Sequence, residues 1–165
     1  MNSENLFVGI GFDSHRFKKG NGLILAGVFI PFDKSFDAHS DGDIVCHSII
    51  DAILGALPIE FEYNNIGTIF PDNDPKFKNA NSLELLNTVV TKISNEFLIN
   101  NCDVIVVLQE PKLRDYLNDM ISNLKRILKT ERVNIKPKTG EFMGFIGNKE
   151  GAAAFSVISI SKKRS

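Results

Sequence analysis

The three histidines of the chain all lie within its first 47 residues, close to aspartates that could share a metal ion with them. Asp13 and His15 are two residues apart after an apolar stretch, so in extended backbone their side chains point to the same side. His47 falls in the first turns of an expected helix. Two histidines and one carboxylate leave a coordination position open, as catalytic zinc sites do. The same donors also serve non-haem iron, so the residues predict a divalent transition metal without selecting one.

Two further aspartates accompany His47 on the expected helix. Asp43, His47 and Asp51 are spaced four apart and form a polar stripe on an otherwise apolar helix. Because an unpaired carboxylate is costly to bury, we expect Asp43 or Asp51 to support His47 at the ion. An Asp-x-His pair alone is also typical of a surface turn, and the two segments together favour the metal site.

Three other segments carry polar residues whose chemistry is less specific. His39 and Ser40, in the segment HSDGD, belong either to a helix-start turn or to the contacts of a substrate beside the metal. The segment FPDNDP (70–75) is either a proline-bracketed turn or a binding loop. The segment KPKTGE (136–141) offers lysines, a hydroxyl and a carboxylate that suit a phosphate with its Mg²⁺. The chain has no Walker A motif and no GxGxxG motif, so neither a P-loop nor a dinucleotide fold is indicated.

Length and composition are those of an ordinary globular protein. The 165 residues are 43% hydrophobic and 24% charged, which predicts one domain over residues 1–165 with a buried core that includes Cys46 and Cys102. With 19 basic and 20 acidic residues, we expect no nucleic-acid and no membrane partner. The chain shows no signal peptide and no apolar run of ~20 residues. A cytoplasmic protein of bacterial type is expected, or an organellar one after removal of a transit peptide.

Apolar periodicity predicts the elements that must position these residues. The expected strands are 6–12, 23–32, 102–108, 133–138 and 152–162. The expected helices are 43–57, 82–97 and 113–128. The first helix has Asp41 or Gly42 as its N-cap, and the second begins with a capping box from Asn81 to Glu84. Residues 58–81 hold three of the six prolines and predict a long ordered loop. This order predicts an α/β (α+β) fold, one mixed sheet covered by helices.

Five segments, taken in order, resemble the 2-C-methyl-D-erythritol 2,4-cyclodiphosphate synthase family over nearly the whole chain. They are GFDSH (11–15), AHSDGDIVCH (38–47), IGTIFPDNDP (66–75), QEPK (109–112) and TGEFMGFIG (139–147). The resemblance implies a homotrimer with an active site at each subunit interface. It also implies conversion of 4-diphosphocytidyl-2-C-methyl-D-erythritol 2-phosphate to the cyclic diphosphate and CMP. This phosphorus–oxygen lyase reaction belongs to the non-mevalonate pathway of isoprenoid biosynthesis.

The resemblance also assigns roles to individual residues of this sequence. Asp13, His15 and His47 would bind Zn²⁺ or another divalent transition metal, and Glu141 would hold Mg²⁺ or Mn²⁺ on the substrate diphosphate. The residues matched to binding of the cytidine diphosphate substrate are Ser40, Asn65, Ile66, Gly67, Phe70, Pro71, Asp72, Asn73, Asp74, Leu108, Gln109, Glu110, Pro111, Lys112, Leu113, Arg114, Pro137, Lys138 and Phe145.

Catalysis in this family is implied to need no protein nucleophile. The 2-phosphate of the substrate attacks its own β-phosphorus and CMP leaves, while His39 and Thr139 would steady the transition state. Two cations and fixed donors stabilise the charge that develops on the phosphoryl oxygens. Holding both reacting groups in one bent conformation supplies the rest of the rate enhancement.

This sequence departs from the family pattern at three places. Asn65 stands where the family usually has an aspartate, and the stretch 58–64 is a few residues longer than usual. Asn148, with Lys149 beside it, stands where the family has an arginine thought to face a cavity on the three-fold axis.

Two other functions are compatible with the residues. A zinc-dependent phosphodiesterase would use the same ions to activate water. A non-catalytic trimeric nucleotide-binding regulator would bind CMP or CDP and would not need the three metal-ligand residues.

Overall fold

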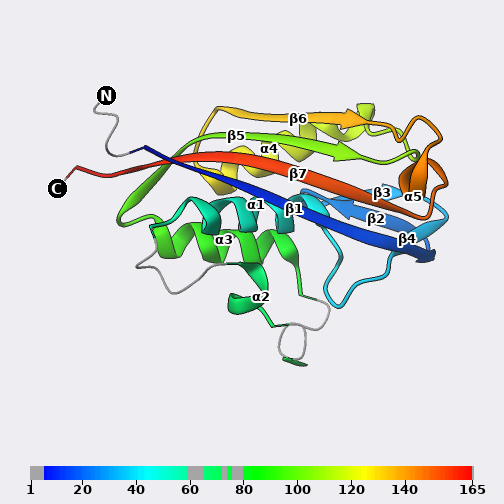
Figure 1. The fold of residues 1–165 in the computed structure, drawn as a ribbon, viewed down its shortest axis with the longest axis horizontal. Helices are drawn as coiled ribbons and strands as arrows, with labels where there is room; N and C mark the ends of the chain where they lie inside the picture. Colours follow the sequence, from blue (N-terminus) through cyan, green and yellow to red (C-terminus); the bar gives the residue numbers. More distant parts are fainter. Residues whose placement is uncertain (1–5, 59–64, 72–73, 76–79, 165) are drawn as a thin grey trace.

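The computed structural model describes residues 6–58, 65–71, 74–75 and 80–164 (Figure 1). The strands are β1 (Leu6–Lys19), β2 (Gly22–Leu25), β3 (Val28–Pro31), β4 (Lys34–Phe36), β5 (Phe97–Val107), β6 (Val133–Lys138) and β7 (Gly151–Lys162). The helices are α1 (Ile44–Ala56), α2 (Ile66–Ile69), α3 (Ser82–Ile93), α4 (Leu117–Leu128) and α5 (Gly144–Gly147), with a 3₁₀ turn at Arg114–Tyr116 before α4.

A five-stranded sheet in the order β4-β1-β7-β5-β6 forms the frame of the molecule. The pairs β1–β4, β1–β7 and β5–β7 are antiparallel, whereas β5 and β6 run parallel. Helix α4 connects this parallel pair, as a parallel crossover requires. The β2–β3 hairpin forms a separate two-stranded sheet. The mixed sheet and its covering helices confirm the predicted α+β class.

Helix α1 covers strands β1 and β7 and contributes most to the core (Figure 1). Ten of its thirteen residues are buried, so the helix is apolar on nearly every side. Helix α3 lies against α1 on the side away from the sheet. Cys46 on α1 and Cys102 on β5 are both fully buried, as the sequence predicted. Among the described residues, no helix is long and apolar enough to span a membrane.

Strand β1 is longer than the sequence predicted, and this changes where the candidate metal-ligand residues Asp13 and His15 lie. The predicted end of the first strand at residue 12 is wrong, because β1 continues to Lys19. Asp13 pairs with Ala154 and His15 with Ala152 of β7, and Phe17 then pairs with Phe36 of β4. Backbone pairing on both edges therefore keeps a polar segment extended that local propensity alone assigns to a loop.

Several other element boundaries also differ from the sequence prediction. The expected strand 23–32 is a hairpin, because Ala26 and Gly27 turn the chain with φ angles of 49° and 73°. The expected helix 82–97 ends at Ile93, and β5 begins at Phe97. Three short elements, β4, α2 and α5, were missed because none is long enough to show a period.

Two glycines of β1 set the distance between this strand and α1. A Cβ atom at Gly9 would lie 1.9 Å from the carbonyl oxygen of Ala52, and one at Gly11 would lie 1.8 Å from that of Ser48. Both distances are far below van der Waals contact, so only glycine lets the helix backbone approach this closely. Gly55, on α1 itself, has a different environment, because its nearest neighbour would be the Ile10 carbonyl oxygen at 3.7 Å.

We therefore expect opposite effects from two alanine substitutions at this contact. Gly11→Ala should lower the free energy of unfolding by about 3 kcal/mol or more, because helix α1 must move away from the strand. Gly55→Ala, the matched control, should raise it by about 1 kcal/mol, since alanine is the better helix former. Urea unfolding followed by circular dichroism measures both changes. Equal stability of Gly11→Ala and the parent chain would contradict the contact.

Candidate active site

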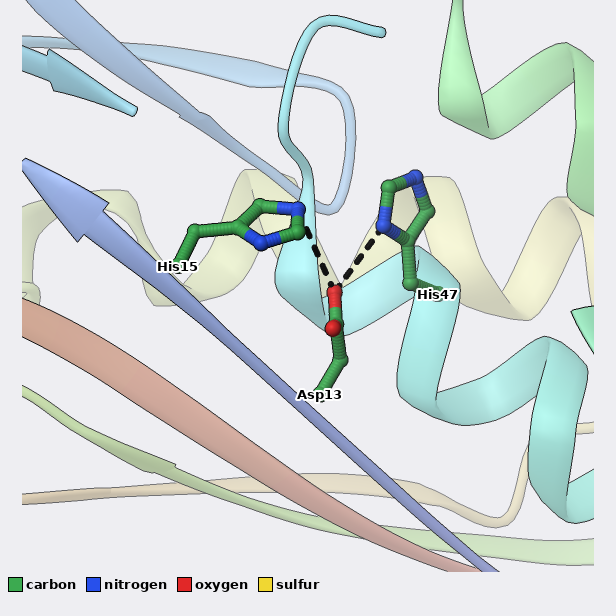
Figure 2. A group of neighbouring side chains, drawn as sticks. All are labelled: Asp13, His15 and His47. Atoms are coloured by element: carbon green, nitrogen blue, oxygen red, sulfur yellow. Dashed lines mark hydrogen bonds and ion pairs between the residues drawn. The ribbon is translucent and has the colours of Figure 1, made fainter. Parts of the chain in front are cut away.

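Asp13, His15 and His47 meet at one point between β1 and α1, as Figure 2 shows. Oδ2 of Asp13 lies 2.9 Å from Nδ1 of His47 and 3.4 Å from Nε2 of His15. One ligand atom from each residue lies within 4.8 Å of the others. Both β1 residues lie on the helix-facing side of the strand, the same side as Gly9 and Gly11. The close approach of α1 therefore brings His47 to them.

The hydrogen bonding of His15 leaves one ring nitrogen available to a metal ion. Nδ1 lies 2.8 Å from the carbonyl oxygen of Ser14, which can only accept, so Nδ1 carries the hydrogen. Nε2 therefore has a lone pair, and this buried atom has no hydrogen-bond partner among the described residues. A buried lone pair beside a carboxylate is a costly arrangement without a cation. The donors present therefore fit a divalent metal ion.

His47 is held on both sides of its ring. Its Nδ1 faces Asp13, and its Nε2 lies 2.8 Å from Oγ of Ser82 and 3.2 Å from Oγ of Ser40. Burial lowers the pKa of His47, but the hydrogen bond and negative charge of Asp13 outweigh it, so the pKa lies above its ordinary value. The Asp13 carboxylate favours a proton on Nδ1 of His47, and a metal ion that binds this nitrogen must displace that proton.

The aspartates expected to support His47 bind backbone groups instead, so that expectation is wrong. Asp43, not Asp41 or Gly42, is the N-cap of α1, and its carboxylate accepts from the N–H groups of Cys46, Ala26 and Gly27 at 2.8–3.0 Å. Burial raises the pKa of Asp43, and these three N–H groups oppose the rise.

Asp51 anchors the loop that carries α2. Its Oδ1 accepts from the N–H of Ile66 at 2.7 Å, while burial raises the pKa of this half-buried carboxyl. Asn65 caps the same short helix by accepting from the Thr68 N–H at 3.1 Å. The two aspartates of the polar stripe on α1 therefore hold neighbouring backbone segments in place: Asp43 holds the β2–β3 turn, and Asp51 holds the start of α2.

A cavity of about 310 Å³ opens beside the three metal-ligand residues. Besides these three, its lining residues are Asp37, Ala38, His39, Ser40, Ile66, Gly67, Phe70 and Leu85. The structure thus brings together most of the first-half residues that the sequence singled out. Pro71 and Asp74 are described but are not lining residues, whereas Asp72 and Asn73 lie outside the described residues. Sequence reasoning missed Asp37, Ala38 and Leu85, although the first two immediately precede His39.

A second cavity, of about 200 Å³, lies where β5 and β6 end. Its lining residues are Leu108, Pro111, Lys112, Leu113, Arg114, Leu117, Pro137, Lys138 and Thr139. All of these except Leu117 were singled out in the sequence. The two cavities share no lining residue.

The remaining candidates from the second half of the chain are not lining residues of this cavity. Gln109 is buried and accepts from the Phe142 N–H at 3.3 Å, while Glu110 pairs with Lys149 at 2.9 Å. The hydroxyl of Thr139 donates to the carboxylate of Glu141, which is exposed and has a φ of 49°. Phe145, on α5, is 49% exposed. Within the described residues of one chain, Glu141 is not part of the metal-ligand group of Asp13.

Metal binding should depend on the three clustered residues and not on the cavity as a whole. We expect His47→Ala to weaken Co²⁺ and Zn²⁺ binding by more than about 100-fold, because a direct ligand is lost. His39→Ala should leave the affinity unchanged, since His39 lines the same cavity outside the cluster. Chelator competition and the visible spectrum of bound Co²⁺ measure the affinity. Stoichiometric metal in His47→Ala would contradict the site.

Comparison with known proteins identifies the family of the chain. Residues 6–161 match the YgbB family. The 2-C-methyl-D-erythritol 2,4-cyclodiphosphate synthase of Caldicellulosiruptor bescii is 47% identical over 93% of this chain and 97% of its own length. The synthase of the same name from Brachyspira hyodysenteriae is 43% identical, over 95% and 99%. The structure of Plasmodium falciparum IspF in a CDP complex superposes with a TM-score of 0.81, at 32% identity, over 99% of this chain and all of that one. The chain therefore belongs to the YgbB family, together with these cyclodiphosphate synthases.

Proposed function

We propose that the chain converts 4-diphosphocytidyl-2-C-methyl-D-erythritol 2-phosphate to 2-C-methyl-D-erythritol 2,4-cyclodiphosphate and CMP, a step of isoprenoid precursor biosynthesis. Its relatives over the full chain length are synthases of this name. The single observation that carries the proposal is the cluster of Asp13, His15 and His47 inside a cavity that also contains His39 and Ser40. A carboxylate and two imidazoles beside an open cavity suit metal-assisted phosphoryl transfer.

The reaction forms one P–O bond and breaks another. The 2-phosphate oxygen of the substrate bonds to the β-phosphorus, and the bond from that phosphorus to the CMP oxygen breaks. Bound at Asp13, His15 and His47, Zn²⁺ supplies Lewis-acid stabilisation of the charge on the phosphoryl oxygens. His39 and Ser40 contact the substrate beside this site. The Phe70–Asp74 loop, of which residues 72–73 lie outside the described residues, holds its methylerythritol part. Binding in one bent conformation keeps the two reacting groups together.

The second cavity suits the cytidine diphosphate part of the substrate. Its walls are largely apolar, and Lys112, Arg114 and Lys138 bring positive charge to its lining. A nucleobase packs well on apolar walls, while cationic side chains and the Thr139 hydroxyl suit phosphate oxygens. We place Mg²⁺ on the substrate diphosphate at Glu141, because this ion binds through few protein carboxylates and through phosphate oxygens.

One face of the sheet gives a reason to expect a homotrimer. Ile10 and Phe12 of β1 pair with Val157 and Phe155 of β7, and these side chains, with Val8, point away from the helices. They are 41–72% exposed, an apolar patch of the kind that association covers. We propose that three chains assemble on this face. A complete site then combines the metal cavity of one subunit with the nucleotide cavity of its neighbour.

The proposed reaction is tested by its products. Purified chain supplied with Zn²⁺, Mg²⁺ and the cytidylyl substrate should release CMP and the cyclic diphosphate in equal amounts, measured by ³¹P NMR. Release of CMP with a linear bisphosphate would instead identify a phosphodiesterase that activates water. Tight binding of CDP without any turnover would identify a nucleotide-binding regulator. Either result contradicts the proposed function.

The shared site is tested by mixing two inactive variants. His47→Ala damages the metal cavity and Thr139→Ala the nucleotide cavity, so about a quarter of the sites in randomly mixed trimers contain two intact halves. Activity should therefore reappear after the two variants are unfolded and refolded together. His47→Ala mixed with His39→Ala is the matched control, because both substitutions damage the same cavity and no mixture restores it. Absence of rescue in the first mixture would argue for a site within one chain.

A further inference from the structure

The second nitrogen of His47 has a partner that the proposed reaction does not use. Nε2 lies 2.8 Å from Oγ of Ser82, the first residue of α3. Ser82 is fully buried and is not a lining residue of the metal cavity. The Ser40 hydroxyl is also near Nε2, at 3.2 Å, but it accepts from the Gly42 N–H and lines the cavity. Ser82 is therefore the closer partner and the one shielded from substrate.

Asp41 determines how the Ser82 hydroxyl is oriented. Its carboxylate accepts from the backbone N–H of Ser82 at 3.0 Å and also from the Ser82 hydroxyl. A serine hydroxyl has a single hydrogen, and a carboxylate can only accept. The hydrogen of Ser82 therefore points to Asp41, and its oxygen lone pairs remain for the Nε2–H of His47.

Further hydrogen bonds that involve backbone groups hold Asp41 close to Ser82. The N–H of Asp41 donates to the carbonyl oxygen of Ala80 at 3.2 Å, and the N–H of Asp43 donates to the Asp41 carboxylate at 3.2 Å. These bonds join the segment before α1 to the start of α3, 41 residues apart for the pair Asp41–Ser82. These hydrogen bonds hold the two segments together without any contribution from the ring of His47.

We propose that Asp41 and Ser82 are positioning residues, which fix the Nε2–H tautomer of His47 and so direct its Nδ1 lone pair toward the metal ion. The proposal rests on the metal-binding role proposed for Asp13, His15 and His47. With the hydrogen held at Nε2, the nitrogen that faces Asp13 is free to bind a cation. Partners of this kind commonly change metal affinity 10–100-fold when they are removed.

The test compares two fully buried serines, Ser82, whose hydroxyl bonds to the His47 ring, and Ser48, whose hydroxyl bonds elsewhere. Ser82→Ala removes the acceptor for Nε2–H and should weaken Zn²⁺ and Co²⁺ binding by about 10–100-fold. Ser48→Ala is the matched control, because Ser48 lies fully buried on α1 and bonds to Ser156 and to the Val45 carbonyl instead. It should leave the affinity unchanged. Affinities are measured by chelator competition without substrate, so the result does not depend on the proposed reaction.

Two further measurements separate positioning from general support of the fold. In the zinc-loaded protein, the Nε2–H proton of His47 should give a slowly exchanging NMR signal that disappears in Ser82→Ala. Asp41→Asn, which keeps the shape but removes the charge, should also weaken metal binding and speed exchange of this proton. Native metal affinity in Ser82→Ala and Asp41→Asn, or an equal loss in Ser48→Ala, would overturn the proposal.

Discussion

The close packing of helix α1 on strand β1 is the constraint on which the rest of the structure depends. Gly9 and Gly11 leave no side chain between the two backbones, because a Cβ atom at Gly11 would lie 1.8 Å from a helix carbonyl. Ala152 and Ala154 of β7 continue this surface of small residues. Since the helix lies so near the strand, the short side chains of Asp13 and His47 can reach each other at 2.9 Å. A metal site that combines side chains from β1 and α1 needs this close approach of the helix to the strand.

Two carboxylates, the fully buried Asp43 and the partly buried Asp41, organise the segment that precedes α1. Asp43 binds the turn of the β2–β3 hairpin and the first turn of α1, and Asp41 binds the start of α3. The cost of burying these groups is offset by the backbone N–H donors that surround them. Asp41 and Asp43, which follow His39 and Ser40 in the chain, therefore join the hairpin turn, α1 and α3. The short motif HSDGD thus combines residues that face the cavity with residues that hold its walls in place.

The arrangement of the two cavities has a consequence for assembly. The metal cavity lies beside β1 and α1, whereas the second cavity lies at the ends of β5 and β6, and no lining residue is common to both. Helices α1 and α4 cover one face of the sheet, and the face formed by Ile10, Phe12 and Phe155 remains exposed and apolar. Association on that face offers a way to bury the patch and to bring a metal cavity close to a nucleotide cavity.

The sequence by itself determined the local features of this protein. Short-range patterns of residue type and spacing predicted the residues that cluster at the metal site, the Asn81 cap of α3 and strand β6. The resemblance of its motifs to a known family implied most of the lining of both cavities. Only the tertiary structure determined the extent of β1 and the hydrogen-bond partners of Asp43, Asp51 and Ser82, because these depend on contacts between distant segments. Strand β1 extends through His15 because β7 and β4 pair with it. The carboxylates of Asp43 and Asp51 accept hydrogen bonds from backbone N–H groups of distant segments. The tertiary structure also placed Ser82 against His47, 35 residues away. Local propensity does not contain the register of distant strands or the packing of helices upon them, and these decide which side chains meet.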